Sequence, residues 1–431
     1  MTEQQALANR PPPSITRLEP RSHSRSQPDL APSLPSSLSP RITLCHFSTI
    51  HTELKSRSFH RECLPLAAAG IGIRYVTALN FTGCRDGVDF IPLPAHKSRL
   101  HRIRALPSLL LQLLAQRADI YHFQDTELLP LAFALKLFYR RRVIYDAYED
   151  FPSVARSHKS IPRLLRAIAA KIISVVERLA ARHFDGLITA DPFTLRRLAR
   201  SGESRKLVFH NFPNLDFFPP PRPAPKNCDI VYRGGLSERA GTFVLLDAMR
   251  LLADHGRPAR LSLIGYFDDS AAESALRNRI RALALESSVT ITGRLSHEAM
   301  AAALSGARIG VSPLQDTPKF RLNLPVKVFE YWACGLPVIA SDLPCIRPYF
   351  RNTHAGLLVR PGDAMEFAIS IAWMLDHPAQ ASRMGQRGRD AVVERFNNHN
   401  EVRKLRDFCL RIAAKSQNVA NQEILSECLS R

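Results

Sequence analysis

The sequence contains no run of about 18 apolar residues, so we expect no membrane-spanning helix. Its N-terminus carries charges and prolines but no apolar segment, so we expect no secretory signal. Acidic residues are few relative to basic ones: 39 Asp and Glu stand against 59 Lys and Arg, which gives a net charge of +20. Such a surplus attracts nucleic acid, acidic membranes or phosphorylated small molecules, and its sign does not choose among them. The sequence predicts a cytoplasmic protein.

The eight cysteines include no CxxC pair, and none pairs with a histidine at the spacing of zinc ligands. We therefore expect reduced, mostly buried thiols and no metal site. The sequence also lacks helix-turn-helix, zinc-finger and RNP-type patterns, so we expect no nucleic-acid partner despite the charge. Phosphorylated small molecules and acidic membranes remain as candidate partners. The oligomeric state is not predicted by any of these features.

Proline-rich segments divide the chain. Residues 1–40 are rich in Pro, Ser and Arg with almost no periodic apolar positions, which predicts a disordered basic tail. A second proline-rich segment, 217–226, can continue neither a sheet nor a helix and predicts a linker. We expect one domain on each side of the linker, then a helix that packs back on the first domain, and a tail. These four parts span 41–216, 227–395, 396–415 and 416–431.

Segments with strand and helix patterns alternate on both sides of the linker. The expected strands are 41–47, 74–79, 119–122, 142–146, 186–189, 206–209, 229–232, 260–264, 289–292, 309–312 and 337–340. The expected helices are 59–69, 163–183, 241–254, 270–284, 296–306, 327–334 and 364–377. This alternation predicts an α/β protein with two doubly wound, Rossmann-like domains that face a central cleft. Ligands of such sheets bind beyond the carboxyl ends of the strands.

The most specific stretch runs from Asn323 to Asp342, NLPVKVFEYWACGLPVIASD. It predicts a helix with Pro325 in its first turn, followed by a buried strand. Lys327 and Glu330 lie at i and i+3, on one face of that helix. A helix N-terminus with a nearby lysine suits a diphosphate, and a carboxylate one turn further can accept hydrogen bonds from ribose hydroxyls. A capped helix with an ordinary ion pair has the same spacing, so the spacing alone leaves both interpretations open.

The wording of this stretch, KxFEYxAxGLPVIASD, resembles the nucleotide-binding signature of retaining glycosyltransferases of family four, which have the GT-B architecture. The resemblance implies that Glu330 binds the ribose of a nucleotide and that Lys327 lies near its diphosphate. It also implies retention of anomeric configuration and catalysis without a bound metal. No cofactor is implied, because the nucleotide-diphosphate sugar is itself a co-substrate.

Further segments resemble the family in the same order, so the likeness covers about residues 41–412. In the second half, the resemblance places these residues near the nucleotide: Gly234, Gly235, Gly265, Gly293, Arg294, Asn323 and Val326. In the first half, the turns HFQD and DAYE resemble the family's HxHD and DxHE turns. The resemblance places these residues on the acceptor or sugar side: His51, His122, Gln124 and Asp125.

The chain departs from the family pattern at the nucleotide domain. The family usually has a first glutamate eight positions before Glu330, where this chain has Leu322 beside Asn323. It also often has an arginine and a lysine on the loop after the first strand of this domain, where they neutralise the diphosphate. Here Arg233 and Arg239 lie one position away from the matching residues. We expect Arg239 to be catalytic together with Lys327 and Glu330, because Arg239 lies in the loop rather than at the strand end.

The N-terminal turns depart from the pattern as well, since Gln124 and Tyr148 replace histidines. The predicted function is transfer of a hexose-type sugar from a nucleotide-diphosphate sugar to a glycan or lipid-linked acceptor, in cell-surface polysaccharide or glycolipid synthesis. The alternatives are a sugar-nucleotide epimerase of the same architecture and a non-catalytic nucleotide-sugar binder. Two basic amphipathic stretches, 96–104 and 163–178, add the hypothesis of peripheral attachment to the inner face of the plasma membrane.

Overall fold

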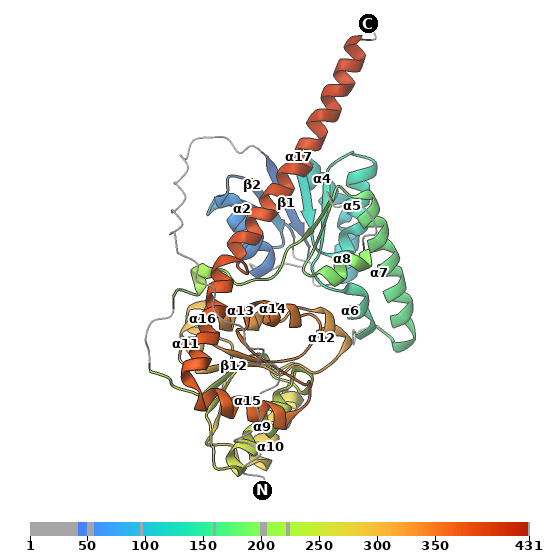
Figure 1. Cartoon of the computed structure of the whole chain (residues 1–431). Helices are drawn as coiled ribbons and strands as arrows, with labels where there is room; N and C mark the ends of the chain where they lie inside the picture. The colour runs from blue at the N-terminus through green and yellow to red at the C-terminus, as the bar shows by residue number, and fades with distance from the viewer. Residues whose placement is uncertain are drawn as a thin grey trace, which may run out of the picture. The chain divides into compact units, whose positions relative to one another are not determined.

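The computed structural model describes residues 42–49, 56–94, 98–157, 161–198, 205–220 and 225–429, so the predicted tail over 1–40 lies outside the described residues (Figure 1). The described chain forms two compact units. We call Phe212–Asn397 the C-terminal unit. The N-terminal unit consists of the described residues up to Asn211 together with Asn398 and the residues that follow it. The chain therefore leaves the N-terminal unit once and returns to it.

The described residues of the N-terminal unit contain an eight-stranded sheet of order β3-β4-β2-β1-β5-β6-β7-β8. Its strands are β1 (Thr43–Ser48), β2 (Gly72–Thr77), β3 (Gly83–Arg85), β4 (Val88–Pro92), β5 (Ile120–Phe123), β6 (Val143–Ala147), β7 (Gly186–Thr189) and β8 (Lys206–Val208). Neighbouring strands are parallel except at the edge, where β3 runs antiparallel to β4. Because the strand order reverses between β1 and β5, the topological switch point lies at their carboxyl ends.

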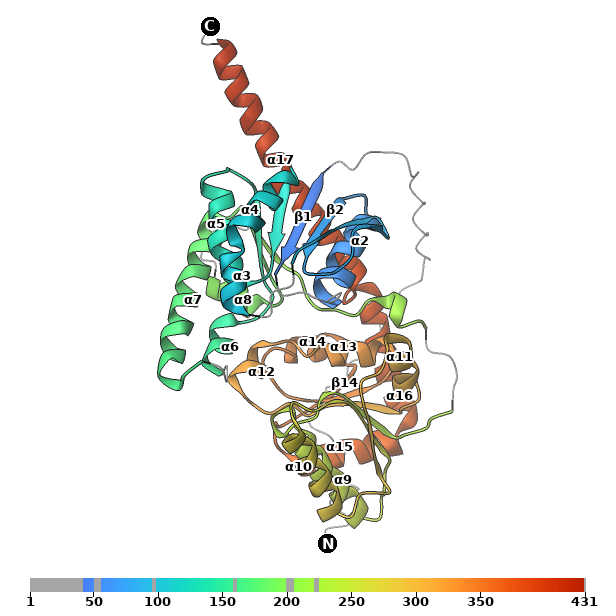
Figure 2. The same ribbon diagram turned by 180° about the vertical axis from the view of Figure 1, so that it is seen from behind.

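Helices cover both faces of this sheet. They are η1 (Ser56–Cys63, a π-helix), α2 (Leu64–Ala68), α3 (Arg99–Arg104), α4 (Leu106–Ala115), η2 (Thr126–Leu128), α5 (Leu129–Leu137), α6 (Phe151–Ser157), α7 (Arg163–His183), α8 (Pro192–Leu198) and α17 (Asn398–Leu429). Strand residues alternate between two buried clusters: Leu44 belongs to the cluster that contains Phe408 of α17, whereas Phe47 belongs to the cluster that contains Leu113 of α4. Figure 1 shows α2 and α17 on one face, and Figure 2 shows α4 and α5 on the other. Both faces are therefore apolar, as in other parallel sheets.

The described residues of the C-terminal unit contain a six-stranded parallel sheet of order β11-β10-β9-β12-β13-β14. Its strands are β9 (Ile230–Gly235), β10 (Leu261–Tyr266), β11 (Val289–Thr292), β12 (Ile309–Ser312), β13 (Val338–Ser341) and β14 (Gly356–Val359). Its helices are η4 (Leu215–Phe217), η5 (Glu238–Ala240), α9 (Thr242–Asp254), α10 (Ser270–Ala282), α11 (His297–Ser305), α12 (Pro318–Leu322), α13 (Val326–Ala333), α14 (Arg347–Thr353), α15 (Ala364–Asp376) and α16 (Pro378–Glu394). The switch point lies between β9 and β12. In Figure 1, α13 and α14 lie on one side of the sheet and α9 and α15 on the other.

The predicted fold class is confirmed, because each unit is a doubly wound α/β domain. Every expected strand is present, and β7, β11, β12 and α7 have the expected bounds. The sequence interpretation missed β3, β4 and β14. Strand β4 begins after the turn at Asp86 and Gly87 and ends at Pro92, and β14 begins at Gly356; glycine and proline are depleted in strands, so both segments resemble turns. Within the described residues, no helix combines the length and apolar character needed to cross a bilayer.

Two boundaries differ from those expected. The C-terminal unit begins at Phe212 rather than at 227, because the Phe212 ring is buried and lies 4.7 Å from that of Phe329. The expected tail over 416–431 is largely helical, because α17 continues to Leu429. Neither proline nor glycine, the residues that most strongly end a helix, occurs within α17.

Candidate functional site

Lys327 lies at the carboxyl end of β9, at the switch point of the C-terminal sheet. Its Nζ donates a hydrogen bond to the Tyr232 hydroxyl over 3.1 Å and lies 4.1 Å from the centre of that ring. The backbone of Gly234 passes so close that a Cβ there would lie 2.9 Å from Nζ. Gly234 has a φ of 142°, a conformation that favours glycine. The structure therefore packs Lys327 directly against the end of β9 that carries Gly234 and Gly235, which we call the glycine-rich loop.

Lys327 belongs to the first turn of α13. Pro325 occupies the cap position of this helix and has no polar side chain to satisfy the first amide groups. Such amides attract anions, together with the helix dipole. Burial lowers the pKa of Lys327 to about 7; the nearby Arg233 guanidinium lowers it as well, whereas the Glu330 carboxylate acts in the opposite direction. An anion bound at this helix end would favour the charged form of Lys327.

Glu330 lies one turn further along α13 and is only 3% exposed. It forms an ion pair with Arg233 at the end of β9, with Oε2 2.7 Å from Nη1. Next to it, the Tyr331 hydroxyl accepts a hydrogen bond from the Arg233 amide over 2.7 Å and donates one to the Val311 carbonyl over 3.2 Å. The pairing of β9 with β12 ends at Tyr232 and Val311. Tyr331 therefore bridges the two strands where they separate, and the sequence interpretation missed both this residue and the partner of Glu330.

The carboxyl ends of β9 and β10 lie side by side. Gly265 pairs with Gly234, and a Cβ at Gly265 would lie 1.7 Å from the Gly234 carbonyl oxygen. Gly235 lies against the ring of Tyr266, which is 44% exposed. The Arg294 guanidinium stacks on that ring, with its Cζ 4.3 Å from the ring centre. Four of the predicted nucleotide residues therefore meet at adjoining strand ends.

The other predicted nucleotide residues lie at ends of elements. Gly293 directly follows β11, and the space where its Cβ would be is open. Asn323 ends α12: its amide donates to the Lys319 carbonyl over 3.0 Å, and its carbonyl accepts from the Cys345 thiol over 3.4 Å. Val326 is the first residue of α13. The described contacts of Asn323 are thus contacts of its main chain.

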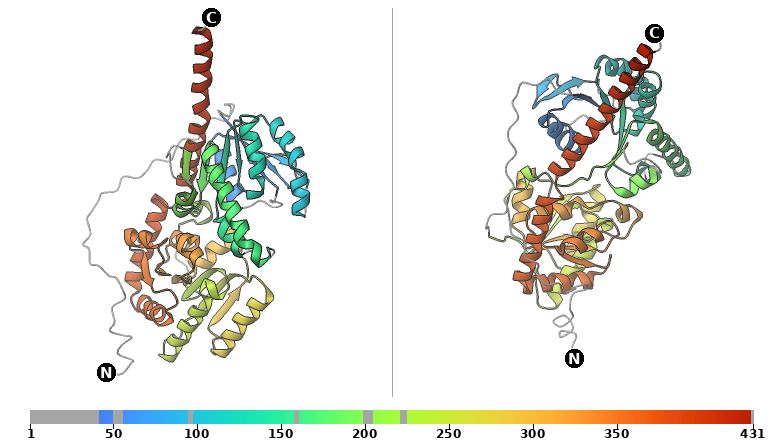
Figure 3. Two further views of the ribbon diagram at one scale, coloured as in Figure 1. Left: turned by 90° about the vertical axis from the view of Figure 1, so that its right-hand side faces the viewer. Right: turned by 45° about the horizontal axis from the view of Figure 1, so that its top comes forward.

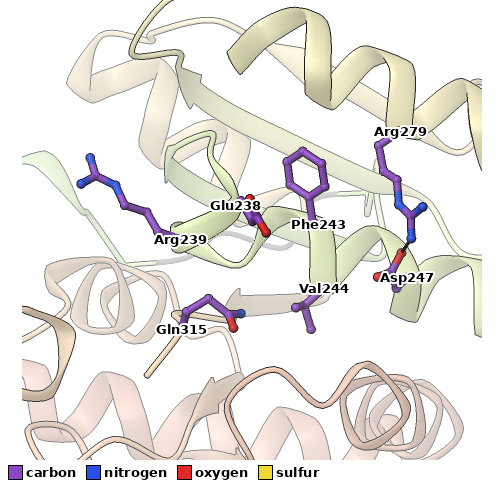
Figure 4. A pocket seen from close by; sticks show the side chains of 7 residues that line it. All are labelled: Glu238, Arg239, Phe243, Val244, Asp247, Arg279 and Gln315. Atoms are coloured by element: carbon purple, nitrogen blue, oxygen red, sulfur yellow. Dashed lines mark hydrogen bonds and ion pairs between the residues drawn. The ribbon is translucent and has the colours of Figure 1, made fainter. Parts of the chain in front are cut away.

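Arg239 lies on η5, and its described ion pair is with Asp268 over 3.2 Å rather than with Glu330. Its side chain is 64% exposed. It borders a cavity of about 620 Å³ beside α9, whose lining residues are Glu238, Arg239, Phe243, Val244, Asp247, Arg279 and Gln315. Figure 4 shows its guanidinium directed away from the paired Asp247 and Arg279. The arginine that contacts Glu330 is therefore Arg233, at the strand end.

In the N-terminal unit, His122 is buried at the switch point. Strands β1 and β5 pair so that His46 and His122 are neighbours, and their Nδ1 atoms lie 3.1 Å apart in a hydrogen bond. Burial lowers the pKa of His122 to about 4; Asp146 acts to raise it and Arg57 to lower it. His122 is therefore neutral at neutral pH and serves as a hydrogen-bonding group rather than as a cation.

Gln124 belongs to a buried network at the same switch point. Its Nε2 donates to the Asp146 carboxylate over 2.8 Å and to the Glu62 carboxylate over 3.2 Å. The Arg57 guanidinium donates two hydrogen bonds to Asp146, over 3.0 and 2.9 Å, and lies 3.2 Å from Glu62. Burial, followed by the charge of Asp146, raises the pKa of Glu62 well above its usual value, although Arg57 opposes this. Burial in this network therefore favours the neutral form of Glu62.

The sequence interpretation missed Arg57 and Glu62 as site residues. They are five positions apart, which in an α-helix would put them on different faces. They lie on the π-helix η1, whose wider turn brings positions i and i+5 together. The segment SRSFHREC also contains His60, Arg61 and two serines, so no feature of the sequence singled out Arg57 and Glu62.

Asp125 lies directly after β5 and is 5% exposed. Its Oδ2 accepts a hydrogen bond from the Ser48 hydroxyl over 2.6 Å. Burial raises the pKa of Asp125 to about 6, with the Ser48 hydrogen bond acting to lower it and the charge of Glu127 to raise it. His51, the remaining predicted residue on the acceptor side, lies outside the described residues.

Among the described residues, His46, Glu62 and His122 place possible metal-binding atoms within 4.8 Å of one another. The Nδ1 atoms of the two histidines already bind each other, and Gln124 donates to Glu62. The Arg57 guanidinium also supplies positive charge beside Glu62. The donor set therefore fits a hydrogen-bonded polar cluster better than a divalent cation.

Two family models match the chain, one in each unit. Residues 56–211 match the "Glycosyl transferase 4-like domain". Residues 227–377 match "Glycosyl transferases group 1". The second match contains the glycine-rich loop, Lys327 and Glu330, and the first contains the network around Gln124. The two matches therefore cover both groups of residues described above.

Curated relatives match part of the chain. The amylovoran biosynthesis glycosyltransferase AmsK of Erwinia amylovora is 28% identical over 179 residues, which is 41% of this chain and 43% of that protein. The putative colanic acid biosynthesis glycosyltransferase WcaL of Salmonella typhimurium is 29% identical over 174 residues, 39% of this chain and 42% of that protein. The matches thus span about two fifths of the length of these relatives.

Solved structures share the fold over most of the chain. Sucrose-phosphate synthase from Thermosynechococcus elongatus superposes with a TM-score of 0.65 at 22% identity, covering 90% of this chain and 100% of that one. Anabaena Alr3699/HepE in complex with UDP superposes with a TM-score of 0.64 at 14% identity, covering 85% and 98%. The chain therefore contains a glycosyl transferase 4-like domain and a glycosyl transferases group 1 domain, and it has the GT-B fold.

Proposed function

We propose that this protein transfers a hexose-type sugar from a nucleotide-diphosphate sugar to a glycan or lipid-linked acceptor, in the assembly of a cell-surface polysaccharide or glycolipid. The observation that carries this proposal is Lys327, packed against Gly234 at a helix end that has no side-chain cap. The names of AmsK and WcaL, which refer to amylovoran and colanic acid biosynthesis, support the polysaccharide assignment. The UDP complex of HepE supports a nucleotide donor.

The chemistry follows from charge. When the bond between the sugar and the diphosphate breaks, negative charge grows on the diphosphate, and fixed cations and amide dipoles stabilise it. Lys327 and the first amides of α13 are such groups, and each contact of this kind is worth about 2–4 kcal/mol by analogy with oxyanion donors. We assign Glu330 to the ribose hydroxyls, with Arg233 as the positioning residue that holds its carboxylate. Arg239 remains a candidate second cation.

We further propose that transfer occurs with retention and without a bound metal. The leaving phosphate would take the proton of the acceptor hydroxyl on the face from which it departs, so that no enzyme nucleophile is needed. The nucleotide side comprises Gly234, Gly235, Gly265, Gly293, Arg294, Asn323 and Val326. We assign the acceptor or sugar side to His51, His122, Gln124 and Asp125 in the N-terminal unit. Among the described residues of that side, Asp125 has a pKa of about 6 and changes charge near neutral pH.

A donor screen tests this function. Purified protein is incubated with UDP-, GDP- and ADP-sugars, and release of the nucleoside diphosphate is measured with and without glycan or lipid-linked acceptors. We expect slow hydrolysis of at least one donor, and Glu330→Gln should raise its KM at least about tenfold because a hydrogen bond to a charged group is lost. Glu273→Gln on the exposed surface of α10 is the matched control and should leave KM unchanged.

The same screen separates the alternatives. An epimerase would convert the sugar nucleotide without an acceptor, and a non-catalytic binder would be stabilised by a nucleotide without turning it over. Equal turnover by wild type and Glu330→Gln would remove Glu330 from the site. Nuclear magnetic resonance of the anomeric proton in the product tests retention, and inversion would contradict that part of the proposal.

A further inference from the structure

One face of α7 exposes large apolar side chains. The residues concerned are 41% to 91% exposed: Leu164, Leu165, Ile168, Ile172, Val175 and Leu179. The opposite face is buried in the N-terminal unit, through Ala170, Glu177 and Ala180. The left view of Figure 3 shows α7 running along the outside of this unit. Exposed apolar residues are ordinary when scattered, but a continuous patch marks an interaction surface.

The spacing of these residues is regular. Leu165, Ile168, Ile172, Val175 and Leu179 follow one another at intervals of three and four, so they form a single stripe along the helix. We call these five residues the α7 stripe. A hollow of about 330 Å³ lies along it, lined by Ile168, Lys171, Ile172, Val175 and Val176. The stripe is therefore the apolar half of an amphipathic helix that lacks a partner within the described chain.

Positive charge borders the α7 stripe. Arg163, Lys171, Arg178 and Arg182 are exposed on the same helix. The acidic residue of α7, Glu177, is buried and paired with Arg197 over 2.9 Å, so it does not offset these charges at the surface. A basic and apolar helix face suits an interface in which apolar groups enter hydrocarbon while Lys and Arg reach anionic head groups.

A second copy of the chain is a poorer occupant. A stripe with intervals of three and four could pair with itself, as in a coiled coil. The positions that border such a seam would then be Lys171 and Arg178 on one side and Ala169 and Val176 on the other, so a second copy would offer the basic side chains no acidic partner. Coiled coils place opposite charges there. The charge of α7 therefore favours an anionic partner over its own copy.

Another apolar and basic group lies on the element packed against α7. The Phe133 ring of α5 lies 6.2 Å from the His183 ring at the end of α7. Just beyond α5, Phe138 is 81% exposed, and it is followed by three arginines at 140–142. This end of the N-terminal unit therefore also combines an exposed apolar side chain with basic residues.

We propose that α7 binds the surface of an anionic lipid bilayer, with the α7 stripe among the acyl chains and the flanking Lys and Arg at the lipid phosphates. The helix lies in the plane of the interface and does not span the bilayer. This inference does not depend on which sugar is transferred. It predicts that attachment requires both the apolar stripe and the anionic lipid, and that attachment weakens as salt screens the charges.

Vesicle flotation tests the proposal with the full-length protein. Vesicles of phosphatidylcholine with phosphatidylglycerol are compared with vesicles of phosphatidylcholine alone, at about 0.1 M salt. We expect flotation with the anionic vesicles only. Ile168→Glu/Ile172→Glu should weaken binding at least about tenfold, because two apolar groups no longer enter the bilayer. Val393→Glu, at a residue 47% exposed on α16, is the matched control and should bind as wild type does.

The charges have their own pair of variants. Lys171→Glu/Arg178→Glu should also weaken binding, whereas Arg277→Glu/Arg281→Glu on α10 makes the same change in net charge away from α7 and should weaken it less. Circular dichroism checks that every variant is folded. Unchanged binding of Ile168→Glu/Ile172→Glu would overturn the proposal, since attachment would then reside elsewhere, for example in the basic residues before 41. A dimer that Ile172→Glu dissociates would also overturn it, because a second copy would then cover the stripe.

Discussion

Lys327 is a cation whose charge depends on what it binds. In the free protein its pKa of about 7 results first from burial and then from Arg233. A diphosphate beside Nζ favours the charged form, so the pKa rises when the donor binds. Between these two pKa values, binding must take up a proton, and the donor affinity falls as the pH rises.

We therefore predict that donor affinity decreases about tenfold per pH unit just above pH 7. Isothermal titration calorimetry with a nucleotide sugar, in two buffers of different ionisation enthalpy, measures both the affinity and the proton uptake. A nucleotide-diphosphate sugar is the suitable ligand, because the phosphates that join its nucleoside to its sugar do not titrate in this pH range. Lys327→Arg keeps its charge at all these pH values, so its affinity should be independent of pH. The same pH dependence in both proteins would assign the titration to another group.

The residues that could be predicted from the sequence are those whose placement is local. Lys327 and Glu330 share a helix, so their spacing fixed their common face. Arg233 could not be chosen over Arg239 in this way, because its contact with Glu330 depends on where β9 ends relative to α13. Arg57 and Glu62 meet through a π-helix, which periodicity at 3.6 residues does not predict. The glycine-rich loop, by contrast, was predicted at the strand end where Lys327 lies.

Elements were predictable where their pattern was long or strongly apolar. The 21-residue α7 shows its period over many turns, and β12 is a short, fully buried strand. Strand β3 could not be predicted, since its three residues are all exposed and its place depends on pairing with β4. The glycines at the two ends of α9 illustrate a second limit of prediction from sequence, which is that residue type does not reveal a residue's surroundings. Gly241 and Gly256 both have positive φ, of 83° and 70°, but their surroundings differ.

This difference predicts unequal effects of one substitution at the two ends of α9. A Cβ at Gly241 would lie 1.6 Å from the Pro313 carbonyl oxygen, whereas no atom lies within 4 Å at Gly256. Gly256→Ala should lower the free energy of unfolding by about 1–2 kcal/mol, because alanine must only adopt the left-handed backbone conformation there. Gly241→Ala must also displace the chain after β12, so it should cost more than that. Urea denaturation of both variants gives the two free energies. Equal losses would mean that the chain at Pro313 yields without cost.

The last helix of the chain belongs to the N-terminal unit, because the chain returns to that unit after it has formed the C-terminal unit. The sequence predicted that a helix near 396–415 returns to the first domain, and α17 begins at Asn398. Its residues Leu405, Phe408 and Ile412 are buried with strand residues of the N-terminal sheet, including Ile144 and Ile188. The periodic apolar positions of this segment were visible in the sequence, but the sequence did not indicate which strands they cover.

We therefore predict that Phe408→Ala destabilises the N-terminal unit. The ring is 0% exposed, and Gly186 of β7 leaves room for it: a Cβ there would lie 3.0 Å from the ring. Removing such a ring leaves a cavity and costs about 3–5 kcal/mol. Arg406→Ala on the same helix, at a side chain 39% exposed, is the control and should change the free energy of unfolding by less than about 0.5 kcal/mol.

Calorimetry with and without a nucleotide identifies which unit is affected. If the donor binds the C-terminal unit, the nucleotide raises the transition temperature of that unit, by a free energy of about 2.7 kcal/mol at a hundredfold excess over Kd. Phe408→Ala should lower the other transition and leave the shift caused by the nucleotide unchanged. If Phe408→Ala instead lowers the nucleotide-sensitive transition, α17 stabilises the molecule through more than the core of the N-terminal unit, and the two units do not unfold independently.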